Sequence, residues 1–238
     1  MSLRKPLLAL LAVCLAGMVA VPFFASAQRE RSYDRGGRDR SHVAGQFDYF
    51  QLVMSWSPSH CQHNSRGHND TQCGVRRAKA FTFVLHGLWP QYERGYPEFC
   101  RTRQRPFVPN PVIDSVMDVM PSRGLIIHQY KKHGTCSGLR PSDYFRVARA
   151  WYKRIKIPSR YQSPRDTMFI APNDLVDEFV QANPGLKPDM MRVICRRGNS
   201  NQLREIRICL TKSGRFRSCG GRPDTSCAPR KMFVPPAR

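Results

Sequence analysis

The pattern of apolar and polar positions along the chain predicts four β-strands. Residues 47–56, FDYFQLVMSW, are aromatic and β-branched with partial alternation, which is typical of a core strand. Residues 81–85 form a short apolar run that would end at His86. Residues 190–196 and 203–210 alternate Val, Ile or Leu with Arg on either side of a Gly-Asn-Ser-Asn stretch. These two segments predict a β-hairpin with one basic face.

Three other segments repeat apolar residues at helical spacing. Residues 112–120 predict a short helix closed by Pro121. A longer helix would begin at Ser142 and end before Pro158, and a third would begin at Asn173. The polar linkers predict loops, at residues 57–77, at residues 91–111 and in the tail from residue 212. Because helices and strands are mixed without strict β-α-β alternation, we expect an α+β fold.

The first 27 residues match a secretory signal peptide. A basic start precedes an almost unbroken apolar run at 7–21, and Ala-Ser-Ala at 25–27 is a small-residue cleavage site. Retention as a membrane anchor is the alternative, but no later segment is long enough to span a membrane. Cleavage would leave residues 28–46 as a flexible basic segment and residues 47–238 as a single domain. We therefore expect an exported protein, periplasmic or secreted.

Charge and cysteine content fit this location. The chain holds 39 Lys and Arg against 17 Asp and Glu, a net charge of +22. A field of this size attracts polyanions, first nucleic acid and then an anionic membrane surface, although it could also serve solubility alone. Removing the signal peptide leaves a charge of +20 and eight of the nine cysteines. An even number of cysteines in an exported chain predicts disulfides, whose pairing the cysteines alone leave open.

Two short stretches concentrate protonatable side chains. One is FVLHGLWP at residues 83–90, and the other is HQYKKHGTC at residues 128–136. Histidine can accept and donate protons near neutral pH. Cleavage of RNA by its own 2′-OH needs a base, an acid and cations for the phosphorane, and it needs no metal. The residues that could supply this set are His86, His128, Lys132 and His133.

A zinc site is the main alternative for these histidines. His128 and His133 are five positions apart with no Glu between them, whereas a helical zinc motif has its histidines four apart. His60, Cys61, His63 and Cys73 also look like zinc ligands, but in an exported chain disulfide use is favoured for the cysteines. We therefore expect no metal and no cofactor.

The two stretches resemble the active-site segments of the ribonuclease T2 family. His86-Gly87-Leu88-Trp89-Pro90 comes first and His128–Cys136 second, as in the family, and Ser55-Trp56-Ser57-Pro58 is similar to the end of its opening strand. The similarity extends loosely over residues 47–227. It implies an α+β fold with a central antiparallel sheet flanked by helices and stabilised by disulfides. It also implies metal-independent cleavage of single-stranded RNA through a 2′,3′-cyclic phosphate, generally at acidic pH. We expect a monomer.

The resemblance assigns a role to each matching residue. His133 would be the general base and His86 the general acid. His128 would bind the scissile phosphate, and Lys132 would stabilise the charge of the transition state. Trp89 would stack on the base upstream of the cut, with core packing as the alternative.

The chain departs from the family pattern at three positions. Gln129 and Tyr130 stand where the family usually has Glu and Trp, and Gln91 stands where some relatives have an Asp that reads the base. A neutral amide keeps a hydrogen bond but not a charge, and loss of one such contributor slows catalysis by about 10²–10³-fold. We retain Gln129 in the catalytic group, and Gln91 and Tyr130 in the substrate-binding group. The prediction is a slowed enzyme of low or unknown base specificity. The alternative is an inactive RNA- or polyanion-binding protein.

The resemblance also narrows the disulfides. It implies Cys100–Cys136, and a nested pair in which Cys195–Cys227 encloses Cys209–Cys219; Cys61–Cys73 then remains. Arginines on the predicted hairpin would help to gather RNA, or would simply form a solvated strand face. They are Arg192, Arg196, Arg204 and Arg207.

Overall fold

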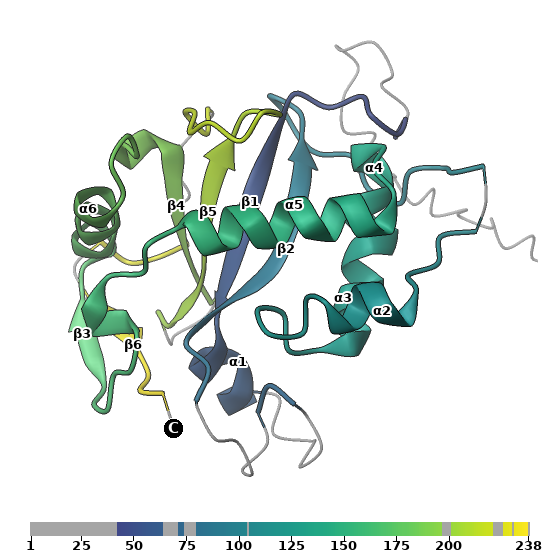
Figure 1. Cartoon of the computed structure of the whole chain (residues 1–238). Helices are drawn as coiled ribbons and strands as arrows, with labels where there is room; N and C mark the ends of the chain where they lie inside the picture. The colour runs from purple at the N-terminus through teal and green to yellow at the C-terminus, as the bar shows by residue number, and fades with distance from the viewer. Residues whose placement is uncertain are drawn as a thin grey trace, which may run out of the picture. The chain divides into compact units, whose positions relative to one another are not determined.

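The centre of the structure, a computed structural model, is a four-stranded antiparallel β-sheet (Figure 1). The strands lie in the order β2-β1-β5-β4, where β1 is Tyr49–Trp56, β2 is Phe83–Gln91, β4 is Met191–Cys195 and β5 is Leu203–Leu210. The expected opening strand and hairpin are both present. The expected strand at 81–85 continues to Gln91, which is possible for the Pro-containing segment because β2 is an edge strand.

The structure describes residues 42–63, 71–73, 80–103, 105–196, 201–220, 226–229 and 231–237, all within a unit that spans Asp39–Arg238. The expected signal peptide and residues 28–41 lie outside this part. Residues 42–46, expected to be flexible, are instead tied to the domain. The Gly45 N–H donates to the carbonyl of Cys136 at 2.9 Å, and Val43 forms a β-bridge with Arg101.

Two amphipathic helices pack on the sheet. Helix α5 is Pro141–Arg154 and crosses in front of the strands in Figure 1, and helix α6 is Pro172–Ala182. Alternate side chains of β1 enter the same buried core as Tyr144 and Phe145 of α5, and each contributes about 1.5–3 kcal/mol by burial. The fully buried Tyr144 hydroxyl donates to the Leu88 carbonyl at 2.8 Å and so fixes α5 to β2. The expected α+β class is confirmed.

Several elements differ from those predicted. Residues 57–63 form helix α1 (Ser57–His63) instead of a loop, and the helix expected at 112–120 is the shorter α2 (Asn110–Asp114). A second sheet pairs β3 (Met168–Ile170) with β6 (Met232–Val234), and single 3₁₀ turns occur at η2 (Ser159–Tyr161) and η3 (Pro188–Met190). Among the described helices, none is long and apolar enough to cross a membrane.

Four disulfides join cysteines that are between 10 and 36 positions apart in the sequence. They are Cys61–Cys73, Cys100–Cys136, Cys195–Cys227 and Cys209–Cys219, the pairs that the family resemblance implied. A disulfide of this kind typically stabilises a fold by about 2–4 kcal/mol.

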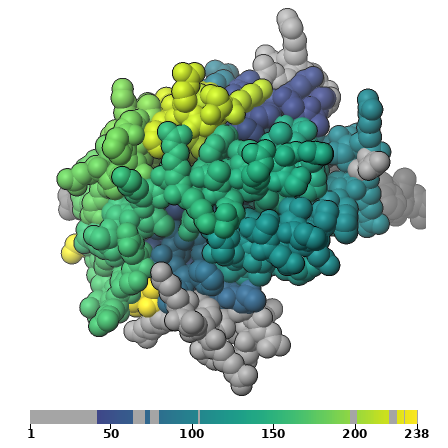
Figure 2. Space-filling model, in the orientation of Figure 1, coloured from purple at the N-terminus to yellow at the C-terminus, as the bar shows by residue number. Residues whose placement is uncertain are grey.

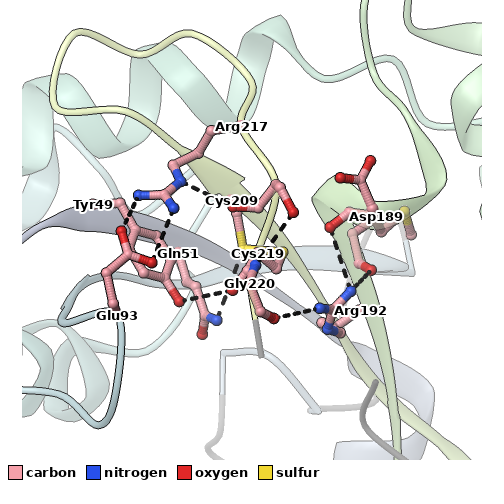
Figure 3. Close-up of a disulfide and its surroundings, with 11 residues drawn as sticks. Tyr49, Gln51, Glu93, Asp189, Arg192, Cys209, Arg217, Cys219 and Gly220 are labelled. Atoms are coloured by element: carbon pink, nitrogen blue, oxygen red, sulfur yellow. Dashed lines mark hydrogen bonds and ion pairs between the residues drawn. A yellow bond between two sulfur atoms is a disulfide. The ribbon is translucent and has the colours of Figure 1, made fainter. Parts of the chain in front are cut away.

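The segment after β5 is fastened to the sheet around the Cys209–Cys219 disulfide (Figure 3). The Tyr49 hydroxyl donates to the Cys219 carbonyl at 3.3 Å. The Arg217 guanidinium lies 4.3 Å from the Tyr49 ring centre and makes hydrogen bonds of 2.9 and 3.1 Å to Glu93. These contacts join the segment to both β1 and the turn that follows β2.

The same segment also contacts α5. The Arg154 guanidinium donates to the Gly214 carbonyl at 3.2 Å and lies 5.7 Å from the centre of the Phe216 ring. In the space-filling view the yellow-green residues of this segment lie against the green residues of α5 (Figure 2). Contacts from the sheet and from α5 therefore hold this segment on two sides.

Candidate active site

A β-bulge in β2 places the first histidine. In the pairing of β1 with β2, Val53 faces Gly87 and Met54 faces Leu85, so His86 between them has no partner. A bulge bends its strand and redirects one side chain, and bulges are frequent near active sites. His86 thereby points its ring toward Glu205 of β5, with 19% of its side chain exposed.

The second histidine segment is a helix interrupted by one π-turn. Helix α3 (Arg123–Gln129) runs into the π-helix η1 (Tyr130–Gly134) and then into the short α4 (Thr135–Ser137). The Thr135 N–H donates to the Tyr130 carbonyl across five residues. Residues five apart are neighbours in a π-turn, and such turns are frequent at functional sites. His128 lies in the α-helical turn before this π-turn, and His133 lies within it.

Trp89 joins the two segments. Its ring stacks on His133, with 4.8 Å between ring centres and 19° between planes, and meets His86 edge-on at 5.2 Å. The indole Nε1 donates to Oε1 of the buried Gln129 at 2.7 Å. A Cβ at position 87 would overlap both Gln129 and Trp89, so Gly87 is what allows this close approach. The structure thus brings His86, Trp89, Gln129 and His133 together.

A buried carboxylate that the sequence did not reveal supports this group. Glu205 is fully buried, and its Oε2 lies 3.1 Å from Nδ1 of His86. Its other oxygen accepts from Nε and an Nη of Arg207 at 2.9 and 2.7 Å, and Arg207 lies 5.0 Å from the Trp89 ring centre. Burial raises the pKa of Glu205, but the His86 hydrogen bond and the nearby charges of His86 and the arginines lower it to about 2. The carboxylate is therefore ionised at any ordinary pH.

His133 has a strongly perturbed environment. Only 4% of the residue is exposed, and its Nδ1 is buried without a hydrogen-bond partner among the described residues. Burial lowers its pKa to about 3, assisted by the positive charges of Lys132, His86, His128 and Arg207. The imidazole is consequently neutral in weak acid and can accept a proton.

The remaining two predicted catalytic residues lie at the exposed edge of the group. His128 is exposed at the end of α3, with its ring 6.3 Å from that of Phe99. The Lys132 Nζ is 3.1 Å from Glu98, in an ion pair in which both side chains are about one-third exposed. Exposed pairs of this kind are weak, about 0.2–1 kcal/mol, so an anionic ligand can compete for the lysine.

Two of the expected substrate-binding residues are elsewhere. Tyr130 is 6% exposed, packs against Tyr144 and Phe145 in the core, and donates its hydroxyl to the Leu139 carbonyl at 3.0 Å. Gln91 is 8% exposed and donates to the carbonyl of Pro90. Because both side chains are buried and already bonded, we no longer assign them to substrate binding.

The hairpin arginines are only partly available. Arg207 is bound to Glu205, and Arg192 donates to backbone carbonyls, including that of Gly220 at 2.8 Å. Arg204 is half-exposed and lies 3.8 Å from Glu205. The expectation that Arg192 and Arg207 gather RNA is corrected: their guanidinium groups hold the fold and the site.

The alternative of a zinc site finds no support in the described residues. Cys61 and Cys73 are joined in a disulfide, and no cluster suited to a metal ion occurs among the described residues.

Comparison with solved structures defines the class as an α+β ribonuclease fold. The RNase-related protein from Calystegia sepium matches with a TM-score of 0.62 at 18% identity, over 81% of this chain and 98% of that one. RNase NT, solved in complex with 5′-AMP, matches with a TM-score of 0.57 at 23% identity, over 80% of this chain and 98% of that one.

Sequence comparison assigns the family. Residues 47–219 match the model of the ribonuclease T2 family. A ribonuclease from Aeromonas hydrophila is 35% identical over 211 residues, 85% of each chain. Ribonuclease I from Escherichia coli strain K12 is 28% identical over 137 residues, 42% of this chain and 51% of that one. The chain belongs to the ribonuclease T2 family and is a T2-type endoribonuclease. Its four disulfides indicate an extracytoplasmic location.

Proposed function

We propose that the protein cleaves single-stranded RNA without a metal ion, by transesterification through a 2′,3′-cyclic phosphate. The observation that carries this proposal is the contact of two imidazoles with one indole: His86 and His133 lie 5.2 and 4.8 Å from the Trp89 ring. They have different surroundings, since one contacts a buried carboxylate and the other is buried among cations. Such a pair is suited to opposite roles in proton transfer.

His133 acts as the base. Its depressed pKa, about 3, keeps the imidazole neutral and ready to accept the proton of the 2′-OH. The 2′-oxygen then forms a bond to phosphorus. Because this nucleophile belongs to the substrate and lies next to the phosphate, its activation requires no metal.

His86 acts as the acid. Its Nδ1 donates to Glu205, which fixes the ring and leaves Nε2 to deliver a proton. That proton goes to the 5′-oxygen as its bond to phosphorus breaks. One proton is taken up and one is released, and the products are a 2′,3′-cyclic phosphate and a 5′-hydroxyl.

The cations at the exposed edge bind the phosphate. His128 contacts a non-bridging oxygen, and Lys132 exchanges Glu98 for the charge that develops in the transition state. Preorganised donors of this kind commonly contribute about 10²–10³-fold in rate. Gln129 holds Trp89 by the 2.7 Å hydrogen bond. A base upstream of the cut stacks on the Trp89 ring in place of the Arg207 guanidinium, which lies 5.0 Å from the ring centre. The enzyme acts as a monomer on RNA outside the cytoplasm, in the periplasm or the medium.

Incubation of the purified mature protein with single-stranded RNA in EDTA tests this proposal. We expect cleavage, with 2′,3′-cyclic phosphate ends on the early products. Intact RNA with tight, salt-sensitive binding would indicate a non-catalytic RNA-binding protein instead. Activity that EDTA abolishes and zinc restores would indicate a metal-dependent hydrolase. Alanine at His86 or His133 should each lower kcat by about 10²–10⁴-fold.

A further inference from the structure

Phe99 is an exposed aromatic residue in an unfavourable backbone conformation. Its φ angle is +49°, which is rare for a bulky side chain, and 56% of the residue is exposed to solvent. Backbone strain of this kind persists only where the surrounding structure enforces it, and it is concentrated at functional sites. Phe99 also lies outside the hydrophobic core of the described residues, so burial of the ring does not repay the strain.

The structure holds this residue in place from several sides. The Phe99 N–H donates to the carbonyl of Lys132 at 2.8 Å. The next residue, Cys100, is bonded to Cys136 by a disulfide. The preceding residue, Glu98, pairs with the Lys132 side chain at 3.1 Å, and its backbone N–H donates to Nδ1 of His42 at 3.1 Å. The exposed ring therefore stands on a rigid base that is attached to the catalytic segment itself.

The ring lies beside the groups to which we assign the phosphate. It meets His128 edge-on, with 6.3 Å between ring centres, and the Lys132 Nζ lies 5.9 Å from its centre. Trp89 is separate from it: one face of that indole is covered by His133, and its edge is bonded to Gln129. Phe99 thus offers a second aromatic surface, on the His128 side of the group.

We propose that Phe99 is a stacking platform for an unstacked nucleobase of single-stranded RNA, next to the nucleotide whose phosphate is cleaved. This inference rests on the proposed ribonuclease function. Aromatic side chains stack on every kind of base, so the platform would strengthen binding without selecting a sequence. A largely exposed ring with Lys132 and His128 beside it suits a chain whose phosphates and bases alternate. The fixed position of the ring lowers the entropy lost when the base binds.

Variants at position 99 test the proposal. Phe99→Ala should raise KM for a short single-stranded oligoribonucleotide by roughly 5- to 100-fold, with kcat little changed. Phe99→Trp should restore KM. Phe99→Asn should raise KM as alanine does while leaving the melting temperature unchanged or higher, because Asn tolerates positive φ. A ring needed only for packing would instead lower the melting temperature when replaced by Asn. The matched control is Phe107→Ala, an exposed residue in the same basic stretch that should change neither value.

A substrate series identifies the stacked base. A single abasic ribose is placed in turn at each position around the cleaved linkage. At one position, the abasic ribose should lower kcat/KM of the wild-type enzyme as much as Phe99→Ala lowers it on the intact substrate. With the abasic ribose at that position, Phe99→Ala should cause no further loss of kcat/KM. The proposal would be overturned if, at every position, the abasic ribose lowered kcat/KM of Phe99→Ala as much as that of the wild type. It would also be overturned if Phe99→Ala had the KM of the wild type.

A binding measurement separates this inference from the proposed function. The same oligonucleotide with a 2′-O-methyl group at the cleaved position cannot react, so its Kd reports stacking alone. A weaker Kd for Phe99→Ala supports the platform even if the wild-type protein were to cleave nothing. Equal Kd values for the two proteins would contradict it even if cleavage is fast.

Discussion

Nδ1 of His86 lies 3.1 Å from Oε2 of Glu205, a carboxylate that is fully buried in strand β5. Taking a charge out of water costs several kcal/mol unless it is paired, and here the pairing comes from His86 on one oxygen and Arg207 on the other. The arrangement fixes the orientation of the imidazole. In the mechanism that we propose, Glu205 is thus a positioning residue for the acid.

Glu205→Gln should lower kcat by about 10²–10⁴-fold with little effect on KM, as for other carboxylates that orient a catalytic histidine. Steady-state kinetics on RNA separates kcat from KM and checks this, with Asp118→Asn as the control, since Asp118 forms ion pairs with Arg149 and Lys153 at the surface. A loss that falls on KM instead of kcat would contradict a positioning role.

Gln129→Glu should raise kcat, by up to about 10²-fold. A carboxylate could still accept the Trp89 hydrogen bond, and its charge would oppose the depression of the His133 pKa that burial causes. Steady-state kinetics on RNA at several pH values measures the gain. Gln91→Glu adds the same charge where the side chain bonds to Pro90, and it should give no gain. If both variants match the wild type, Gln129 is not what limits the rate.

Stability should decline in acid in two overlapping windows, one for each of two buried groups. The folded pKa of His133, about 3, is below the ordinary value of 6.5, so only the unfolded chain takes up this proton between those limits. Stability from this source is full above pH 6.5 and is lost as pH falls, by at most about 1.4 kcal/mol per unit. Glu205, with a pKa of about 2 instead of 4.5, adds a loss below pH 4.5.

Urea unfolding at a series of pH values measures both windows. His133→Asn should flatten the decline between pH 6.5 and 4.5 and reduce its slope between pH 4.5 and 3, where Glu205 also contributes. Glu205→Gln should act in the opposite way, flattening only the decline below pH 4.5. A His133→Asn protein with the slope of the wild type would show that this histidine is protonated normally in the folded state.

Gly87→Ala should impair the site through overlap with the Gln129 oxygen and the Trp89 indole. Overpacking of this kind costs about 1–3 kcal/mol in unfolding free energy, and displacement of Trp89 should lower kcat as well. Thermal unfolding and kinetics together measure the two effects. Gly124→Ala is the control: nothing lies within 4 Å of a Cβ there, so the helix should gain slightly in stability. Full activity in Gly87→Ala would mean that Trp89 need not stay in place.

The sequence predicted the parts of the fold that depend on local pattern. Alternation identified β1 and the β4–β5 hairpin, and helical spacing identified α5. It missed α1 because a polar stretch held by the Cys61–Cys73 disulfide shows no apolar period. The strands β3 and β6 have three residues each, which is too short for any period to appear.

The candidate site was predicted only where a motif marks it. His86, His128, Lys132 and His133 lie in recognisable stretches, but their support comes from residues far away in sequence. Glu205 is 119 positions from His86 and lies between arginines, so its strand suggested an exposed basic face. The sequence did contain one signal for Glu205: a carboxylate within an otherwise apolar strand. A buried charge of this kind requires a partner. Tyr130 was expected to bind substrate because it lies between predicted catalytic residues in the sequence. In the structure its side chain faces the core.

The Cys100–Cys136 disulfide joins the loop of Phe99 to the helix of the histidines, across 36 positions of sequence. Thiols stay reduced in the cytosol and pair only in an oxidising compartment. A newly made chain therefore lacks this bond while it is still in the cytosol. The loop of Phe99 and the segment that carries the histidines become covalently joined only where the chain is oxidised.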